Sequence, residues 1–124
     1  IINMQPQVMG STLAPANVDE RDVLDHMRGL LSGLLIGGKG LLSKTKQAER
    51  AEIGIDLQTP LRDHMDDPRP ETAVQRLLKI RRRVETAIGQ LVEFFDFATC
   101  KARDLRHLTS KLVRKLLAYH LTLA

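Results

Sequence analysis

The stretch that decides the fold is Leu34-Leu35-Ile36-Gly37-Gly38-Lys39-Gly40, a short apolar run that follows a helical pattern and stops abruptly at glycines. A run of this length, closed by a glycine turn, is typical of a buried strand in a parallel sheet. Parallel strands alternate along the chain with the helices that cover them. The stretch therefore predicts an α/β fold.

The flanking sequence predicts the order strand, helix, strand, helix, strand, helix, helix. The expected strands are 8–14, 34–36 and 55–60, and the expected helices are 19–32, 44–53, 71–96 and 105–122. Ser43 is a suitable N-cap for the second helix, and Gly54 supplies its C-terminal stop. About three strands flanked by helices make a thin sheet, followed by a long helical pair. We therefore expect the remaining strands upstream of Ile1 or from a partner.

The composition is that of an ordinary globular domain. The chain has 124 residues, of which 43% are hydrophobic and 27% charged, so residues 1–124 are treated as one domain in which residues 1–9 need not be ordered. Aromatic residues make up only 3%, so the core must rest on Leu, Ile and Val. Cys100 is the single cysteine, which excludes an intrachain disulfide. With no secretory signal and no membrane-length apolar run, a cytoplasmic location is expected.

Charge is unevenly distributed along the chain. The net charge is +4, with an acidic excess in residues 1–70 and a basic excess in residues 71–124. A basic half indicates a polyanionic partner such as duplex DNA, bound weakly and with salt dependence. Solvated basic faces on two long helices explain the same pattern equally well. The candidate DNA-binding residues are Lys79, Arg82, Arg83, Lys111, Arg114 and Lys115.

The glycine turn and the histidines carry no recognisable ligand motif. The run from Gly37 to Gly40 matches neither the phosphate-loop pattern nor the dinucleotide fingerprint, so a turn that needs positive φ is the simpler interpretation. No zinc-ligand spacing links the four histidines with Cys100.

Glu85 is an acidic residue in an apolar context. On a helical wheel it falls beside Leu78, Ile88 and Val92, at the edge of the apolar stripe of the helix expected over 71–96. A carboxylate at the edge of a buried face costs free energy unless it is paired or liganded. Arg81 lies one helical turn earlier and is a suitable ion-pair partner.

Five segments of the chain resemble bacterial insertion-sequence transposases of the DDE type. They occur in that family's order and at similar spacing, and they span about residues 10–120. The segments are LAPANVDER at 13–21, LLIGGKGLLS at 34–43, GIDLQTPLR at 54–62, RRRVET at 81–86 and ARDLRHLTS at 102–110.

The resemblance implies a ribonuclease-H-like fold, of which this chain would be the incomplete C-terminal part. In that family two aspartates and one glutamate bind two divalent metals, usually Mg²⁺, which activate water and then a DNA 3′-hydroxyl. The family's glutamate matches Glu85, which is therefore the candidate catalytic and metal-binding residue. The second aspartate would fall at Gly38, and the first would lie upstream of the matched segments.

A single carboxylate cannot hold two Mg²⁺ ions. We therefore expect that this chain binds no metal and does not cleave DNA by itself. Three functional interpretations stay open. The chain is a piece of a transposase for DNA transposition, or a non-catalytic module that binds DNA or another transposase copy, or a small helical interaction protein without a nucleic-acid role.

Overall fold

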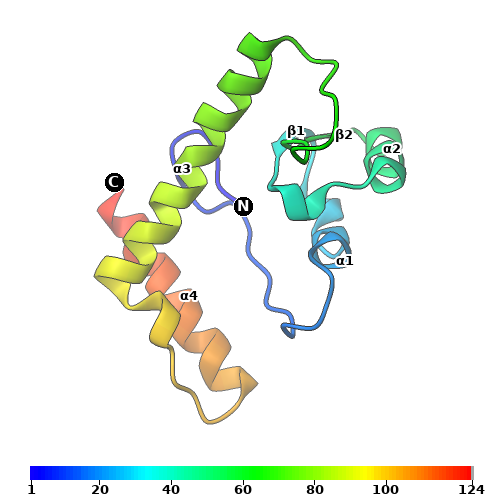
Figure 1. Cartoon of the computed structure of the whole chain (residues 1–124). Coiled ribbons are helices and arrows are strands. Elements are labelled where there is room, and N and C mark those ends of the chain that lie inside the picture. The colour runs from blue at the N-terminus through cyan, green and yellow to red at the C-terminus, as the bar shows by residue number, and fades with distance from the viewer. Residues whose placement is uncertain (124) are drawn as a thin grey trace. The chain divides into compact units, whose positions relative to one another are not determined.

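The structure, a computed structural model, describes residues 1–123 as two compact units (Figure 1). Unit 1 combines residues 1–13 with the chain from residue 82 onward, and unit 2 comprises residues 14–81. The long helix α3 (Glu71–Phe95) belongs to both units. The other regular elements are α1 (Glu20–Asp25), β1 (Gly33–Ile36), α2 (Lys44–Glu52), β2 (Ile55–Gln58) and α4 (Leu105–Thr122), with short 3-10 helices at Arg28–Leu30, Lys39–Leu41 and Phe97–Thr99.

Unit 2 is built on the parallel pair of β1 and β2, which pair from Gly33↔Ile55 to Ile36↔Gln58. The crossover helix α2 packs against β2. Its N-terminus is capped as predicted, because the Ser43 hydroxyl accepts a hydrogen bond from the Lys46 N–H at 3.3 Å. Gly54 follows the helix with φ of +82°, a conformation that favours glycine. The prediction of a parallel α/β arrangement is thus confirmed for these two strands.

The two strands differ in burial. Ile55 and Leu57 of β2 are 1% and 4% exposed, whereas Leu34 of β1 is 63% exposed. Residues 34–36 do form a strand, as predicted. The prediction that this strand is buried is wrong, because Leu34 is exposed. Leu34 and Ile36 of β1 line a groove together with residues of α3 that belong to unit 2.

The first helix is shorter than predicted. Its expected range of 19–32 is divided into α1, which ends at Asp25, and a separate 3-10 turn. Gly29 lies in that turn, and glycine disfavours an α-helix by about 1 kcal/mol relative to alanine. Leu24 and Met27 are nevertheless both buried, so the break keeps the apolar residues in contact with the rest of unit 2.

A charged cluster joins α1 to α2. Arg50 is 3% exposed, and its guanidinium donates to Asp25 Oδ1 at 2.7 Å and to the Arg21 carbonyl at 2.8 Å. Lys46 donates to Asp25 Oδ2 and to Asp22 Oδ1, both at 2.6 Å. Burial raises the pKa of the Asp25 carboxyl, but the hydrogen bonds from Lys46 and Arg50 outweigh it, so the net pKa lies below its usual value.

Unit 1 is a helical pair formed by α4 and the C-terminal part of α3. Ala87, Leu91 and Tyr119 form its buried core, and the Phe95 ring meets the Tyr119 ring edge-on at 6.2 Å between centroids. The predictions of helices over 71–96 and 105–122 are confirmed by α3 and α4. α3 ends where Asp96 adopts the left-handed conformation, with φ of 51°.

Residues 8–14 do not form the strand that their apolar pattern predicts. Among the described residues, the N-terminal segment has a single antiparallel bridge, between Ile2 and Val8. The Val8 N–H donates instead to His120 Nε2 at 2.8 Å, and the Tyr119 hydroxyl donates to the Pro6 carbonyl at 3.2 Å. The backbone N–H of Val8 and the carbonyl of Pro6 thus form hydrogen bonds with side chains of α4, and not with a neighbouring strand.

Residues 1–123 therefore contain two strands where about three were expected. The α/β class is confirmed, and the ribonuclease-H-like topology remains a prediction. No helix within residues 1–123 is both long enough and apolar enough to cross a membrane.

Candidate metal centre and DNA-binding surface

Glu85 lies on α3 in an exposed position. The apolar residues that were expected to surround it are exposed as well: Leu78 by 37%, Ile88 by 56% and Val92 by 43%. The core-facing side of α3 carries Leu77, Ala87 and Leu91 instead. The prediction that Glu85 lies at the edge of a buried face, and therefore needs a partner or a ligand, is wrong. Glu85 and Arg81 each have an interaction partner, and their mutual ion pair stays a prediction.

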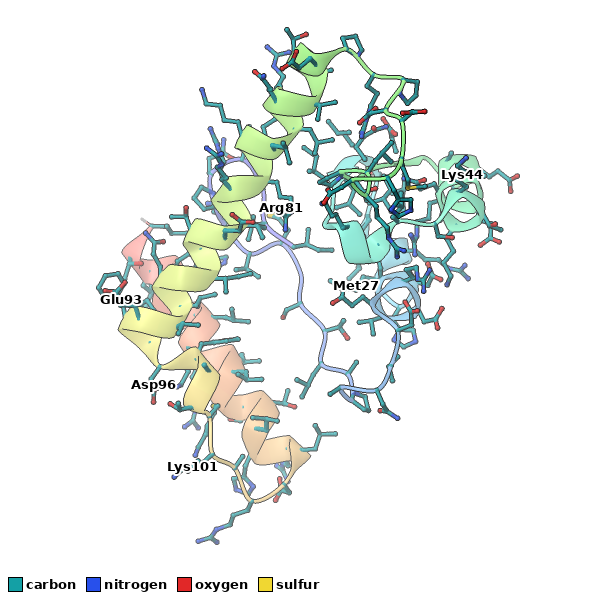
Figure 2. All side chains as sticks on the ribbon, viewed as in Figure 1. Met27, Lys44, Arg81, Glu93, Asp96 and Lys101 are labelled. Carbon is teal, nitrogen blue, oxygen red and sulfur yellow. The ribbon has the colours of Figure 1, made fainter. Side chains whose placement is uncertain are left out.

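Gly38 lies two residues beyond the carboxyl end of β1, with φ of −83° and ψ of 170°. The prediction that this turn needs positive φ is wrong, because all residues adopt these angles. A Cβ at Gly38 would lie 3.7 Å from Arg81 Nη2 and 3.9 Å from Arg81 Nε, with no other non-neighbouring heavy atom within 4 Å. A side chain at position 38 thus has room, and its first neighbour is a guanidinium (Arg81 is labelled in Figure 2).

The neighbouring glycines have a different reason to lack side chains. A Cβ at Gly37 would meet Leu41 Cδ1 at 2.7 Å, and one at Gly40 would meet Glu20 Oε2 at 2.5 Å. Both contacts are with the ends of flexible side chains, so a side chain at either position would require Leu41 or Glu20 to shift. At Gly38 a Cβ would make no contact this close.

The acidic residues of the described chain do not fit a two-metal centre. Residues 1–123 contain no group of three or more His, Cys, Asp or Glu side chains that is arranged to hold a metal ion. Asp19 and Asp25 are engaged by cations, since Arg21 Nη2 lies 2.6 Å from Asp19 Oδ2. At position 38, where the resemblance places a carboxylate, the adjacent charge is the Arg81 guanidinium rather than a second acid.

A groove of about 560 Å³ runs beside β1 in unit 2. Apolar side chains and two cations line it, including Leu34, Ile36, Leu77, Ile80, Arg69 and Arg76. Arg69 is fixed in place, because its guanidinium donates to Asp67 Oδ2 at 2.7 Å and to the Thr59 carbonyl at 2.9 Å. Arg76 is exposed and makes no ion pair among the described residues. In open α/β sheets ligands bind beyond the carboxyl ends of the strands, where Gly38 also lies.

The six candidate DNA-binding cations fall into two groups. Lys79, Arg82 and Arg114 are exposed. The other three use their charged groups within unit 1, since Arg83 donates to the Met4 carbonyl, Lys111 to the Lys101 carbonyl and Lys115 to the Asp96 carbonyl. The role of all six in DNA binding stays a prediction, and the charged groups of the first three make no hydrogen bond or ion pair within the described residues.

Sequence reasoning did not place Arg69 and Arg81 near the end of β1. The sequence indicated Arg81 as a partner for Glu85, but its approach to Gly38 depends on how α3 packs beside the sheet. Arg69 lies between Pro68 and Pro70, and that rigid context was the one local signal of a fixed side chain. The histidines and Cys100 form no metal site in the described residues, and Cys100 is a half-buried free thiol.

Comparison with known proteins identifies one family. A sequence model described as the transposase DDE domain matches residues 1–117, which is nearly the whole chain. No curated protein and no solved structure matches the chain significantly.

Proposed function

The chain belongs to the transposase DDE domain family, and we propose that it serves DNA transposition by binding duplex DNA without cutting it. The family implies an interaction with DNA, and its members generally depend on a divalent metal. Three features of this chain support binding without cleavage. They are the basic excess after residue 70, the glycine at position 38 and the absence of a metal-binding acid cluster from residues 1–123.

The observation that carries the proposal is the surroundings of Gly38. A two-metal mechanism needs several carboxylates that converge on the ions. At position 38 this chain has no side chain, and the nearest charge is the positive Arg81 guanidinium. A cation at this place disfavours the binding of a divalent metal. Glu85 is the one matched acid that remains, and a single carboxylate does not hold two metal ions.

Binding is supported by exposed cations on the helices. Lys79 and Arg82 are exposed on α3, and Arg114 is exposed on α4. Each cation that neutralises a phosphate releases condensed counterions, which makes the affinity fall as salt rises. With about three such contacts, the logarithm of the affinity should fall with a slope of about −3 against the logarithm of the salt concentration. This predicts weak binding that is steeply sensitive to salt.

The test is a fluorescence-anisotropy titration of a labelled 20-base-pair duplex in NaCl from 50 to 200 mM with EDTA present. Replacing Lys79, Arg82 or Arg114 by Gln should each lower the salt slope by about one. Arg28→Gln is the matched control, because Arg28 is exposed on the short 3-10 helix of unit 2 and belongs to none of the candidate surfaces. Absence of binding, or binding that is unchanged by salt, would contradict the proposal.

A second proposal concerns the sheet. Within the described residues β1 pairs only with β2, so its other edge has unpaired backbone groups, and Leu34 beside it is exposed. Such an edge is a template for another strand. We propose that β1 and β2 belong to a ribonuclease-H-like sheet that is completed by a strand of an intact transposase copy. Co-expression with a longer family member should then yield a complex, and separate elution of the two chains would contradict it.

A further inference from the structure

Helix α4 is apolar on two sides. One side packs on the core of unit 1 through Leu116 and the buried Tyr119. The second side carries what we call the α4 row, which consists of Val113, Leu117 and Leu121, exposed by 57%, 61% and 70%. Residues four apart are neighbours on a helix surface, so the row is a continuous strip about 12 Å long. Single exposed apolar residues are ordinary, whereas a strip on the second side of a packed helix is typical of a helix with a second neighbour.

The α4 row is complementary to a second copy of itself. Its spacing is symmetric about Leu117, because Val113 and Leu121 lie at equal distances before and after that residue in the sequence. If two copies of α4 lie antiparallel with a two-fold axis beside Leu117, Val113 of each copy faces Leu121 of the other. The two Leu117 side chains then face each other. An isologous contact of this kind uses the same surface on both copies and closes as a dimer.

The charges of α4 favour the antiparallel arrangement. The helix contains no acidic residue, and a parallel pair in register would place each of its cations next to the same cation of the other copy. In the antiparallel pair the exposed Arg114 lies opposite residue 120 of the other copy, in the last turn of that helix, where the helix dipole attracts a cation. His120 adds no positive charge there, because its Nε2 accepts the Val8 N–H at 2.8 Å and therefore carries no proton.

From this geometry we infer that α4 pairs antiparallel with α4 of a second copy of this chain, through the α4 row. The inference concerns unit 1 and is independent of DNA binding. With the axis beside Leu117, the two helices overlap over about 20 Å of their length and about 10 Å of their width. This contact is smaller than the interface of about 800 Å² per partner that stable complexes bury. The dimer is therefore weak, with a dissociation constant of about 100 µM.

Sedimentation equilibrium without DNA measures the association, at chain concentrations from about 20 to about 500 µM. The unaltered chain should change from mostly monomer to mostly dimer over this range. Leu117→Glu places two like charges beside the two-fold axis and should weaken the dimer by about tenfold or more. Leu105→Glu is the matched control, because Leu105 is 68% exposed on α4 but lies outside the overlap of the two helices. Equal melting temperatures of both variants and the parent chain at the lowest concentration show that the variants are folded.

Disulfide cross-linking tests the orientation, in a Cys100→Ser background oxidised by air with copper phenanthroline as catalyst. Leu117→Cys should cross-link to itself. Val113→Cys should cross-link to Leu121→Cys when the two chains are mixed, because these positions meet across the axis. Val113→Cys alone should not cross-link, since its two copies lie about 12 Å apart along the helices and a disulfide needs Cα atoms within about 7 Å.

Three results would overturn the inference. The first is a chain that stays monomeric up to the highest concentration. The second is a dimer that Leu117→Glu weakens no more than Leu105→Glu does, because such a dimer uses another surface, such as the open edge of β1. The third is Val113→Cys that cross-links to itself, which indicates a parallel pair. None of these results bears on the proposed function, since no DNA is present in either experiment.

Discussion

Removing the Asp25 carboxylate should destabilise unit 2 more than any other single charge deletion in the cluster that joins α1 to α2. In Asp25→Ala, Arg50 keeps its hydrogen bond to the Arg21 carbonyl but loses Asp25, its one counter-ion within residues 1–123. The Arg50 side chain is 3% exposed, so its charge would be left buried without compensation.

The magnitude follows from burial. Breaking one side of a buried ion pair costs about 3–5 kcal/mol. The Asp25 side chain is 29% exposed, so water reaches the pair in part and we expect the lower end, about 3 kcal/mol. Asp22→Ala is the matched control, because Asp22 also pairs with Lys46 but is 61% exposed. It should cost less than about 1 kcal/mol.

The assay is urea unfolding at pH 7, followed by far-UV circular dichroism. With an m-value of about 1.5 kcal/mol/M, a loss of about 3 kcal/mol lowers the midpoint by about 2 M urea. A double-mutant cycle with Arg50→Met isolates the coupling, because the double variant removes both charges and should recover much of the loss. If Asp25→Ala and Asp22→Ala shift the midpoint equally, the buried-charge reasoning is refuted.

Three further predictions concern stability. Tyr119→Ala should cost about 3–5 kcal/mol, because the ring is 1% exposed and packs edge-on against Phe95; thermal melting checks this, with Tyr119→Phe costing about 1 kcal/mol as the control. Ser43→Ala should cost about 1 kcal/mol through loss of the cap to the Lys46 N–H, and equal melting of the variant and the parent chain would count against that cap. Because the pKa of Asp25 is lowered, its contribution is complete at neutral pH and is lost as pH falls below about 4. Acid titration of the midpoint should therefore be steeper in the parent chain than in Asp25→Ala.

Local patterns predicted the helices well. The ranges 71–96 and 105–122 correspond to α3 and α4, and 44–53 corresponds to α2, because apolar periodicity and caps are both encoded within each helix. The parallel pairing of β1 with β2 also followed from the alternation of strands and helices. The helix expected over 19–32 was too long. The apolar pattern continues past Asp25, but the α-helix ends there and Gly29 lies in a 3-10 turn.

Features that depend on tertiary contacts were not predictable in this way. Val8 looked like a strand residue, but its N–H binds His120, which lies more than a hundred residues later. Leu34 was expected to be buried, but it is exposed. Its exposure depends on which other elements cover β1, and the sequence of the strand does not determine that. Glu85 was expected at the edge of a buried face, but the buried residues of α3 are Leu77, Ala87 and Leu91. The approach of Arg81 to Gly38 depends on the placement of α3 beside β1, which sequence spacing does not fix.

The central claim is that this chain binds DNA without cleaving it, and a nicking assay tests it most directly. Supercoiled plasmid is incubated with the chain in 5–10 mM Mg²⁺ or Mn²⁺ at low salt, where anisotropy on the same preparation shows the DNA to be bound. The account predicts bound plasmid that remains supercoiled, both for the parent chain and for Glu85→Gln. Metal-dependent conversion to open circles, lost in Glu85→Gln and retained in Arg28→Gln, would contradict it.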